Sequence, residues 1–322
     1  MAAGYQEVAG RPPVTLPGPW NSAAITVVLP TYNEAANLPV IVDALFGLAL
    51  TGLRMVVVDD NSSDGTGAVA EDLAVRHGRD RMSVVHRPEK QGLGRAYVDG
   101  MSRAIRGDAE FVVQMDSDLS HRPEYLPQML GALLSSNADV VIGSRYIAGA
   151  SLSQRWPWHR KLLSSFANAY ARAFLRPGIR DVTAGFKLWR SAALHDIDLG
   201  SVRSKGYSFQ VEMSHRAVRG GLKVLEVPIH FADRAAGRSK LSLRVQLESA
   251  LMPLRLRFGR RGRQPGHGRT GPALINGQMI NAVMPPQNSL SNDDIAAVIT
   301  YVRHQFGKVD QLTTPAEVAA KR

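Results

Sequence analysis

Two aspartates, Asp116 and Asp118, follow an apolar run that begins at Phe111. Such a run predicts a buried strand, and the strand would carry both carboxylates to the rim of a sheet. Hard oxygen ligands at this spacing suit a hard cation such as Mg²⁺ or Mn²⁺, which in turn binds a diphosphate. A surface loop could also tolerate the two acids. Adjacent carboxylates without a cation repel each other, however, and this favours a metal site.

A second acidic pair, Asp59 and Asp60, ends the apolar run that begins at Val56. A carboxylate at a strand end can accept a hydrogen bond from a ribose hydroxyl or from a base N–H. Asx turns and a helix cap could instead explain the polar residues from Asn61 to Thr66, and this structural alternative stays open. Together the two acidic pairs indicate an enzyme that binds an activated nucleotide.

Three further features could belong to a nucleotide site. The segment Pro30–Glu34 could grip a base and ribose through its backbone and Tyr32, although a strand-to-helix turn explains it equally well. The segment Lys90–Gly94 resembles a glycine-rich phosphate cradle, although glycines before a helix are common turn residues. His121 is close to the aspartates in sequence and is more typical of a hydrogen-bonded loop residue than of a metal ligand.

Cationic side chains recur at loop-like positions in the second half of the chain. Because arginine forks match phosphate oxygens, an acceptor that carries a phosphate would account for them. Taken singly, each is more typical of a surface residue. They are Arg145, Arg155, Arg160, Arg234, Arg238 and Lys240.

These residues need a scaffold that brings several strand ends together. Short β-branched runs alternate with helical patterns, which predicts an α/β fold with a doubly wound, mostly parallel sheet and flanking helices. Ligands bind beyond the carboxyl ends of such strands, where both acidic pairs fall. The expected strands are 25–29, 55–58, 82–85, 111–115 and 138–142, and the expected helices are 34–48, one capped at 64–66 that ends near His77, 93–105, and one that Pro123 opens at its first position.

The remainder of the chain divides by composition. Residues 1–24 are rich in proline and have no apolar core, which predicts a flexible arm rather than a signal peptide or anchor, and no segment predicts a membrane span. Residues 151–240 are less regular and are expected to form an extension on the acceptor side. Residues 241–258 favour a helix, and 259–272 are expected to form a basic linker.

The net charge of +11 is concentrated in one block. Residues 238–269 hold nine Lys or Arg against one acid, whereas residues 270–322 hold four of each sign. Such a block suits an anionic lipid surface, and it lacks the interleaved aromatic residues that nucleic-acid binding would favour. A solvated linker is the plain alternative. The absence of cysteine excludes disulfides, thiolate metal sites and thioether haem attachment.

Nine segments, taken in order between about Ile25 and Leu256, resemble the family-2 glycosyltransferases of GT-A fold. Among these, the resemblance is to the polyprenyl-phosphate (dolichyl-phosphate) mannosyltransferases. The segments are Pro30–Glu34, Val58–Thr66, Gln91–Ala96, Met115–Asp118, Gly143–Tyr146, Trp156–Arg160, Asp181–Lys187, Lys205–Glu212 and Asp233–Lys240. No single segment is specific, but their order is.

The resemblance implies inverting transfer of mannose from GDP-mannose to a polyprenyl phosphate held in the membrane, with Mg²⁺ or Mn²⁺ on Asp116 and Asp118. Some members of the family have a Gln as a further metal-site residue at the position where this chain has Ser120. Water could then be the third ligand of the metal. UDP-glucose is the alternative donor. Implied donor contacts are Pro30, Tyr32, Glu34, Val58, Asp60 and Ser117, and implied phosphate-facing or acceptor positions are Arg145, Arg160, Arg234 and Lys240.

The same resemblance implies how catalysis would proceed. The acceptor oxygen is anionic near neutral pH, so strong general-base help is less necessary than for a sugar hydroxyl. The metal, Arg234 and Lys240 would stabilise the departing GDP. Residues 241–263 would dock a leucine face and an arginine cluster on anionic lipid from the cytoplasm, making the enzyme peripheral to the membrane.

The catalytic domain is therefore expected to span residues 25–258. Residues 273–322 resemble the end of a class I cytochrome c, in which Met284 would be the axial haem ligand. The Cys-x-x-Cys-His attachment motif is missing, so haem is not expected and the segment is interpreted as a fused remnant with a small helical tail. An electron carrier or partner-binding module built on this tail is the rival hypothesis. A nucleotidyltransferase is disfavoured because the glycine-rich loop expected at its first strand is missing.

Overall fold

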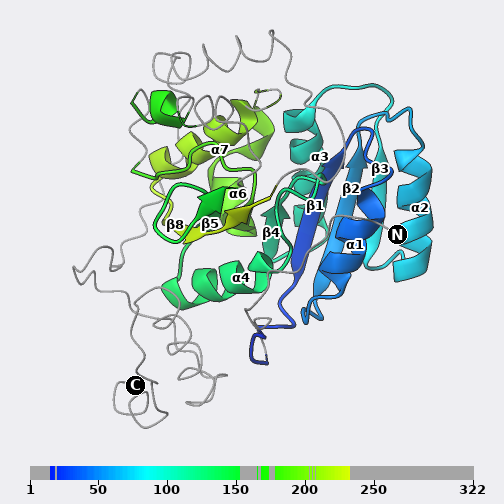
Figure 1. Ribbon diagram of the computed structural model, residues 1–322, viewed down its shortest axis with the longest axis horizontal. Coiled ribbons are helices and arrows are strands. Elements are labelled where there is room, and N and C mark those ends of the chain that lie inside the picture. Colours follow the sequence, from blue (N-terminus) through cyan, green and yellow to red (C-terminus); the bar gives the residue numbers. More distant parts are fainter. Residues whose placement is uncertain are drawn as a thin grey trace.

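The computed structural model describes residues 15–18, 20–152, 165, 168–173, 178–202, 204, 206 and 208–232. Arg155, Arg160, Arg234, Arg238 and Lys240, the basic block and the cytochrome-like segment lie outside these residues. Within the described part, a seven-stranded sheet has helices on both faces, as expected for a GT-A fold (Figure 1). No helix in this part is long and apolar enough to span a membrane.

The sheet has the strand order β3-β2-β1-β4-β7-β5-β8. Neighbouring strands run parallel except around β7, which is antiparallel to both β4 and β5. The carboxyl ends of the six parallel strands therefore lie along one edge, and the loop before β7 arrives at the same edge. The strands are β1 (Ile25–Thr31), β2 (Leu53–Asp59), β3 (Met82–His86), β4 (Phe111–Gln114), β5 (Val140–Ser144), β7 (Lys187–Arg190) and β8 (Val224–Pro228).

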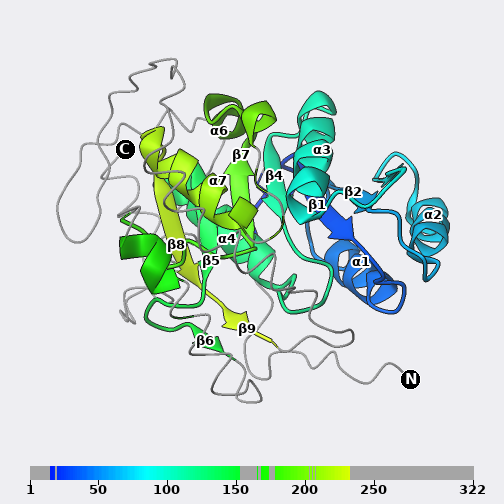
Figure 2. The same cartoon turned by 90° about the horizontal axis from the view of Figure 1, so that it is seen from above.

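Two apolar cores form because the central strands are buried on both faces. In β1, for example, Val27 and Leu29 belong to one core and Val28 to the other. Helices α1 (Leu38–Phe46), α2 (Thr66–His77) and α4 (Tyr125–Ser136) cover the first face, and α3 (Leu93–Arg106), α6 (Ser191–Asp196) and α7 (Ser208–Arg219) cover the second (Figure 2). The described part also contains a one-turn 3₁₀ helix (Leu199–Ser201), helical residues 168–173, and a small second sheet of β6 (Ser151–Leu152) and β9 (His230–Phe231).

Most predicted boundaries differ from the structure by a few residues: β1, β2 and β5, for example, end at Thr31, Asp59 and Ser144. Helix α1 begins at Leu38 rather than at residue 34, because residues 35–37 form a turn in which the N–H of Asn37 donates to the carbonyl oxygen of Glu34. Helix α4 begins at Tyr125, and Pro123 lies in the turn before it, where its carbonyl accepts from the N–H of Leu126. Strand β4 ends at Gln114, one residue before the predicted end.

The expected division of the chain also needs two corrections. Leu16 and Trp20, within the expected flexible arm, are buried in the core, and Leu16 lies beside α4. Their burial is favourable because moving an apolar side chain out of water lowers the free energy. The domain thus extends at least to Leu16. Residues 151–240 were expected to be less regular, but Lys187–Arg190 and Val224–Pro228 form β7 and β8 of the main sheet.

Candidate functional site

The predicted acidic residues meet at the carboxyl edge of the sheet. Strand β1 lies between β2 and β4, so the ends of all three are adjacent. In the register, Thr31 is opposite Asp59. The Ser117 hydroxyl, just beyond β4, donates to the carbonyl oxygen of Pro30 at 3.0 Å. This bond ties the Asp116–Asp118 turn to the end of β1.

Asp116 and Asp118 are held in different ways. The Asp116 side chain is 25% exposed, and its Oδ1 accepts a hydrogen bond from the Tyr97 hydroxyl at 2.7 Å. Asp118 is buried, and its Oδ1 accepts from the backbone N–H and the hydroxyl of Ser120, at 3.1 and 2.5 Å. Ser120 therefore holds Asp118.

The donor set fits a hard divalent cation that arrives with its substrate. The described residues contain no group of three or more His, Cys, Asp or Glu able to hold a metal. Asp116 and Asp118 supply only carboxylate oxygens. Mg²⁺ and similar ions are commonly bound through one or two carboxylates, with substrate phosphates and water completing the shell. The pair could thus hold Mg²⁺ or Mn²⁺ against a diphosphate.

The second acidic pair is largely engaged within the fold. Asp60 is buried, and its carboxylate accepts from Arg87 Nη1 at 2.7 Å and from the backbone N–H groups of Gln91 and Gly92 at 3.0 and 2.8 Å. Asp59 similarly accepts from the backbone and hydroxyl of Ser62. The glycine-rich segment therefore presents two of its N–H groups to a carboxylate rather than to a phosphate, which favours the turn interpretation.

Tyr32 and Glu34 lie partly exposed at the rim, whereas Val58 is buried in the end of β2. Lys90 Nζ lies 3.5 Å from the centre of the Tyr32 ring, a cation–π contact that brings the glycine-rich segment against the Pro30–Glu34 turn. Glu34 accepts from the Asn37 side chain at 2.7 Å. The structure thus places both predicted side chains beside the acidic edge, where a nucleotide could reach them.

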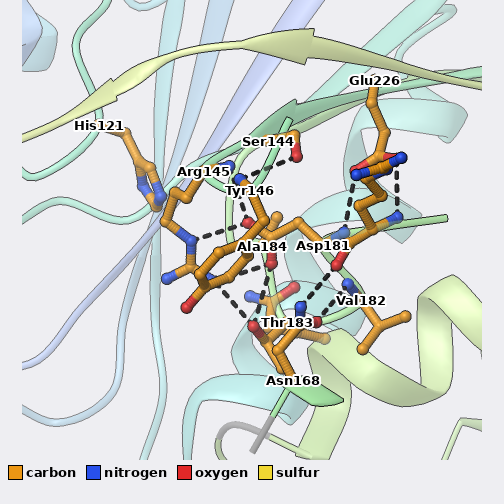
Figure 3. Close-up of polar contacts among 12 residues, drawn as sticks. His121, Ser144, Arg145, Tyr146, Asn168, Asp181, Val182, Thr183, Ala184 and Glu226 are labelled. Carbon is orange, nitrogen blue, oxygen red and sulfur yellow. Dashed lines mark hydrogen bonds and ion pairs between the residues drawn. The ribbon is translucent and has the colours of Figure 1, made fainter. Parts of the chain in front are cut away.

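Arg145 extends from the end of β5 and is fixed by a buried carboxylate (Figure 3). Its Nε and Nη2 donate to the two carboxylate oxygens of Asp181 at 2.8 and 2.9 Å, and Nη2 also reaches the Thr183 hydroxyl at 2.7 Å. Burial alone would raise the pKa of Asp181, but the Arg145 guanidinium outweighs this and holds that pKa below its usual range. Within the described residues, Nη1 of Arg145 has no hydrogen-bond partner, which leaves it available for a phosphate.

The loop that carries Asp181 is braced from several elements. Glu226 on β8 accepts from the backbone N–H groups of Arg180 and Asp181, and Asn168 accepts from that of Val182 (Figure 3). These hydrogen bonds hold the loop in place and so position the Asp181 carboxylate beside Arg145. The role of Asp181 could not be predicted from the sequence, because only the antiparallel course of β7 brings residue 181 beside residue 145.

A buried lysine lies beneath the same loop. Lys187 at the start of β7 is fully buried, and its Nζ donates to the carbonyl oxygen of Ala184 and, at 3.0 Å, to Oε1 of Gln210. Gln114 on β4 donates to the carbonyl oxygen of Gly185 at 3.3 Å. Burial lowers the pKa of Lys187 to about 7. Nothing in the sequence signalled that this lysine would be buried.

His121 is enclosed between aromatic rings rather than placed in a polar loop. It is 2% exposed and packs against Phe186 and Phe231, with ring centres 5.5 and 5.1 Å away. Its Nδ1 lies 3.9 Å from Oδ2 of Asp116 and has no hydrogen-bond partner within the described residues. Burial lowers the pKa of His121, so the ring is neutral near pH 7.

Comparisons with known proteins agree with this geometry. The sequence matches the family described as glycosyl transferase family 2 over residues 26–198. A polyprenol monophosphomannose synthase from Mycolicibacterium smegmatis is 46% identical over 216 residues, which are 67% of this chain and 80% of that protein. An undecaprenyl-phosphate mannosyltransferase from Micrococcus luteus is 40% identical over 218 residues, 68% of this chain and 87% of that protein.

Solved structures share the fold at lower sequence identity. A glucosyl-3-phosphoglycerate synthase from Mycobacterium tuberculosis, solved with Mn²⁺ and UDP, has a TM-score of 0.56 at 21% identity and covers 78% of this chain and 87% of its own. A mannosyltransferase from Pyrobaculum calidifontis, solved with GDP-Man and Mn²⁺, has a TM-score of 0.51 at 20% identity, covering 75% and 66%. With a family match over more than half of its length, the chain is a glycosyltransferase and belongs to glycosyl transferase family 2.

Proposed function

We propose that this enzyme transfers mannose from GDP-mannose to the phosphate of a polyprenol, giving polyprenyl-phosphate mannose and GDP. The observation that carries the proposal is the identity of 46% and 40% to two proteins named for polyprenyl-phosphate mannosyl chemistry. The geometry supports it through the carboxylate pair at one edge of the sheet and an arginine fixed close by. A structural relative of the same fold was solved with GDP-Man and Mn²⁺, which supports the choice of this donor.

Asp116 and Asp118 would hold Mg²⁺ or Mn²⁺, which would stabilise the negative charge that develops on the departing diphosphate. Their donor chemistry fits either ion. Tyr32 and Glu34 lie at the rim where the base and ribose would bind, with Pro30, Val58, Asp60 and Ser117 as the remaining proposed donor contacts. Asp60 would contribute mainly by holding the 87–92 segment, since its carboxylate already accepts three hydrogen bonds there.

The proposed reaction is a direct displacement. A phosphate oxygen of the acceptor attacks the anomeric carbon of mannose, the bond from that carbon to the diphosphate oxygen breaks, and the configuration inverts. The oxygen is already anionic near neutral pH, so little general-base help is needed. Arg145 and Arg160 are proposed to bind the acceptor phosphate, and Arg234 and Lys240 to stabilise the departing GDP.

The acceptor's polyprenyl chain would stay in the bilayer while the enzyme works at its cytoplasmic surface. The arginine-rich block at residues 238–269 is proposed to bind anionic lipid there. Sedimentation with anionic vesicles tests this idea. Replacement of Arg255, Arg257, Arg260, Arg261 and Arg263 by Gln should reduce the bound fraction, and an unchanged fraction would make the block a linker.

A panel of sugar nucleotides, each supplied with a short polyprenyl phosphate and Mn²⁺, tests the proposed function. The mass of the lipid product identifies the sugar transferred. GDP-mannose should give the mannosyl product at the highest rate. Faster transfer from UDP-glucose would instead identify a polyprenyl-phosphate glucosyltransferase, and no lipid product from any donor would refute the proposal.

A further inference from the structure

We propose that Tyr97 is a positioning residue, whose hydroxyl fixes the Asp116 carboxylate in the orientation needed to hold the catalytic cation. The inference rests on the proposed function, because it assigns Asp116 to that cation. Tyr97 is not proposed to contact the sugar or the phosphates. Its effect on the reaction is to orient the Asp116 carboxylate.

The hydrogen bond between the two side chains is short and well enclosed. The Tyr97 hydroxyl lies 2.7 Å from Oδ1 of Asp116, and the tyrosine is fully buried. Its ring stacks on Phe209 of α7, with 5.3 Å between ring centres and 6° between ring planes. A hydrogen bond to a carboxylate is stronger than one between neutral groups, and a clamped ring lets the hydroxyl point in one direction.

Two glycines bring the tyrosine within reach of the site. Gly94 and Gly100 lie three residues before and after Tyr97, so all three residues are on nearby faces of α3. A Cβ at Gly94 would overlap the carbonyl oxygen of Ser204, and one at Gly100 would overlap the side chain of Val28. The helix can therefore approach the sheet and its neighbours closely enough for residue 97 to contact residue 116.

Within the described residues, Tyr97 is the one hydrogen-bond donor to Asp116. His121 lies 3.9 Å from the other carboxylate oxygen, too far for a hydrogen bond. Asp118, by contrast, is held by Ser120 in its own loop. Loss of the tyrosine hydroxyl would therefore free the Asp116 side chain to rotate while leaving Asp118 in place.

The contacts of α3 with the two acidic strand ends also give the glycine-rich segment Lys90–Gly94 a structural role in place of a phosphate cradle. Gln91 and Gly92, at the start of α3, donate to Asp60, and Tyr97 farther along the helix donates to Asp116. One helix thus contacts both acidic strand ends. Residues that orient a metal ligand in this way typically contribute about 10- to 100-fold to metal affinity.

The test is Tyr97→Phe in the full chain, with Tyr125→Phe as the matched control. Both changes remove one phenolic oxygen, and the Tyr125 hydroxyl accepts from the backbone N–H of His230 at 2.9 Å. Electron paramagnetic resonance of free Mn²⁺, during titration in the presence of GDP, gives the metal affinity. We expect about 10- to 100-fold weaker binding for Tyr97→Phe and no change for Tyr125→Phe.

Two further measurements separate a positioning role from a folding role. Thermal unfolding without metal should be similar for the two variants, and excess Mn²⁺ should restore most of the mannosyl transfer by Tyr97→Phe, which it would not do for a misfolded enzyme. A wild-type Mn²⁺ affinity in Tyr97→Phe, or a loss of affinity that excess Mn²⁺ does not rescue, would overturn the role of Tyr97 while the proposed function stands. Absence of GDP-dependent Mn²⁺ binding by the wild-type enzyme would instead refute the proposed metal site itself.

Discussion

At the scale of single residues, the Asp116 carboxylate is enclosed on two sides. Tyr97 donates to Oδ1, while Gly185 and His121 lie next to Oδ2. A Cβ added at Gly185 would lie 2.9 Å from Oδ2 and 2.9 Å from the His121 ring. Position 185 therefore has no room for a side chain, and the absence of one is part of how the carboxylate is placed.

Gly185→Ala should reduce transfer at limiting Mn²⁺ by about 10-fold or more, because the new methyl group displaces Asp116. Overpacking of this kind also costs about 1–3 kcal/mol of stability. Gly200→Ala is the control, since a Cβ there meets only a carboxylate oxygen of Asp198 at 3.9 Å. Steady-state rates across a Mn²⁺ series measure the effect, and equal rates for both variants would show that Asp116 tolerates the methyl group.

Residue types alone predicted that carboxylates would gather at strand ends, and the structure places them there. Residue types could not predict which of these carboxylates are already hydrogen-bonded to other groups of the protein. Asp60 accepts from Arg87, which lies 27 positions later and reaches it only because β3 pairs with β2. Tyr97 gave no signal of its own beyond the glycines that flank it on α3.

At the scale of elements, β7 organises the part of the site around Arg145. Because it runs antiparallel between β4 and β5, the loop that precedes it reaches the carboxyl edge, where Asp181 meets Arg145. Five of the six parallel strands were predicted from the alternation of apolar runs with helical patterns. Strand β7 was not, since it has four residues and begins with a lysine, and β8 was not predicted either.

Asp181→Asn should destabilise the fold by about 3–5 kcal/mol, because it leaves the Arg145 charge buried without its partner. Asp43→Asn is the matched control. Asp43 is 53% exposed and pairs with Arg76 at 3.7 Å, and such surface pairs contribute about 0–1 kcal/mol. Urea denaturation measures both free energies of unfolding. A loss below 1 kcal/mol for Asp181→Asn would mean that the guanidinium finds another partner.

Lys187 should make the stability of the protein depend on pH. Burial lowers its pKa to about 7, whereas an unfolded chain keeps a lysine near the model value of 10.5. Between these values the unfolded chain binds a proton that the folded chain does not, so stability should rise as pH increases above about 7. The charged groups that act on it are Asp181, Arg145 and Asp116.

The measurement is urea denaturation of the wild type and Lys187→Met at pH 7, 8 and 9. The wild type should gain up to about 1.4 kcal/mol per pH unit relative to the variant. Differences in other titrating groups cancel in this comparison. Parallel curves for the two proteins would show that Lys187 stays protonated in the fold.

At the scale of the whole molecule, the mostly parallel sheet and its flanking helices form a packed unit whose core includes Leu16 and Trp20. The relatives match 216 and 218 residues, about two thirds of the chain. The cytochrome-like segment, residues 273–322, lies outside the described residues, and its dispensability stays a prediction. The N-terminal packing was missed because Leu16 and Trp20 lie in a proline-rich stretch without periodicity.

Truncation after Gln264 should leave mannosyl transfer largely intact, since the family resemblance ends near Leu256 and the segment lacks the cysteines of a haem domain. Product formation per mole of folded protein is the measurement. An absorption spectrum of the full chain without a Soret band would agree. A truncated protein that binds GDP-mannose but no longer transfers mannose would place the C-terminal segment in the acceptor site.

The carboxylates beyond β4 are proposed to support metal-dependent mannosyl transfer to a polyprenyl phosphate. The most direct measurement is mass spectrometry of the lipid product formed from GDP-mannose with Mn²⁺, by the wild type and by Asp118→Asn. The wild type should form mannosyl-phosphoryl polyprenol only with the metal present. The variant should keep its fold and lose about 100-fold or more in rate, because an amide is a poor ligand for a hard cation. Undiminished product from Asp118→Asn at saturating Mn²⁺ would show that Asp118 does not hold a metal that the transfer requires.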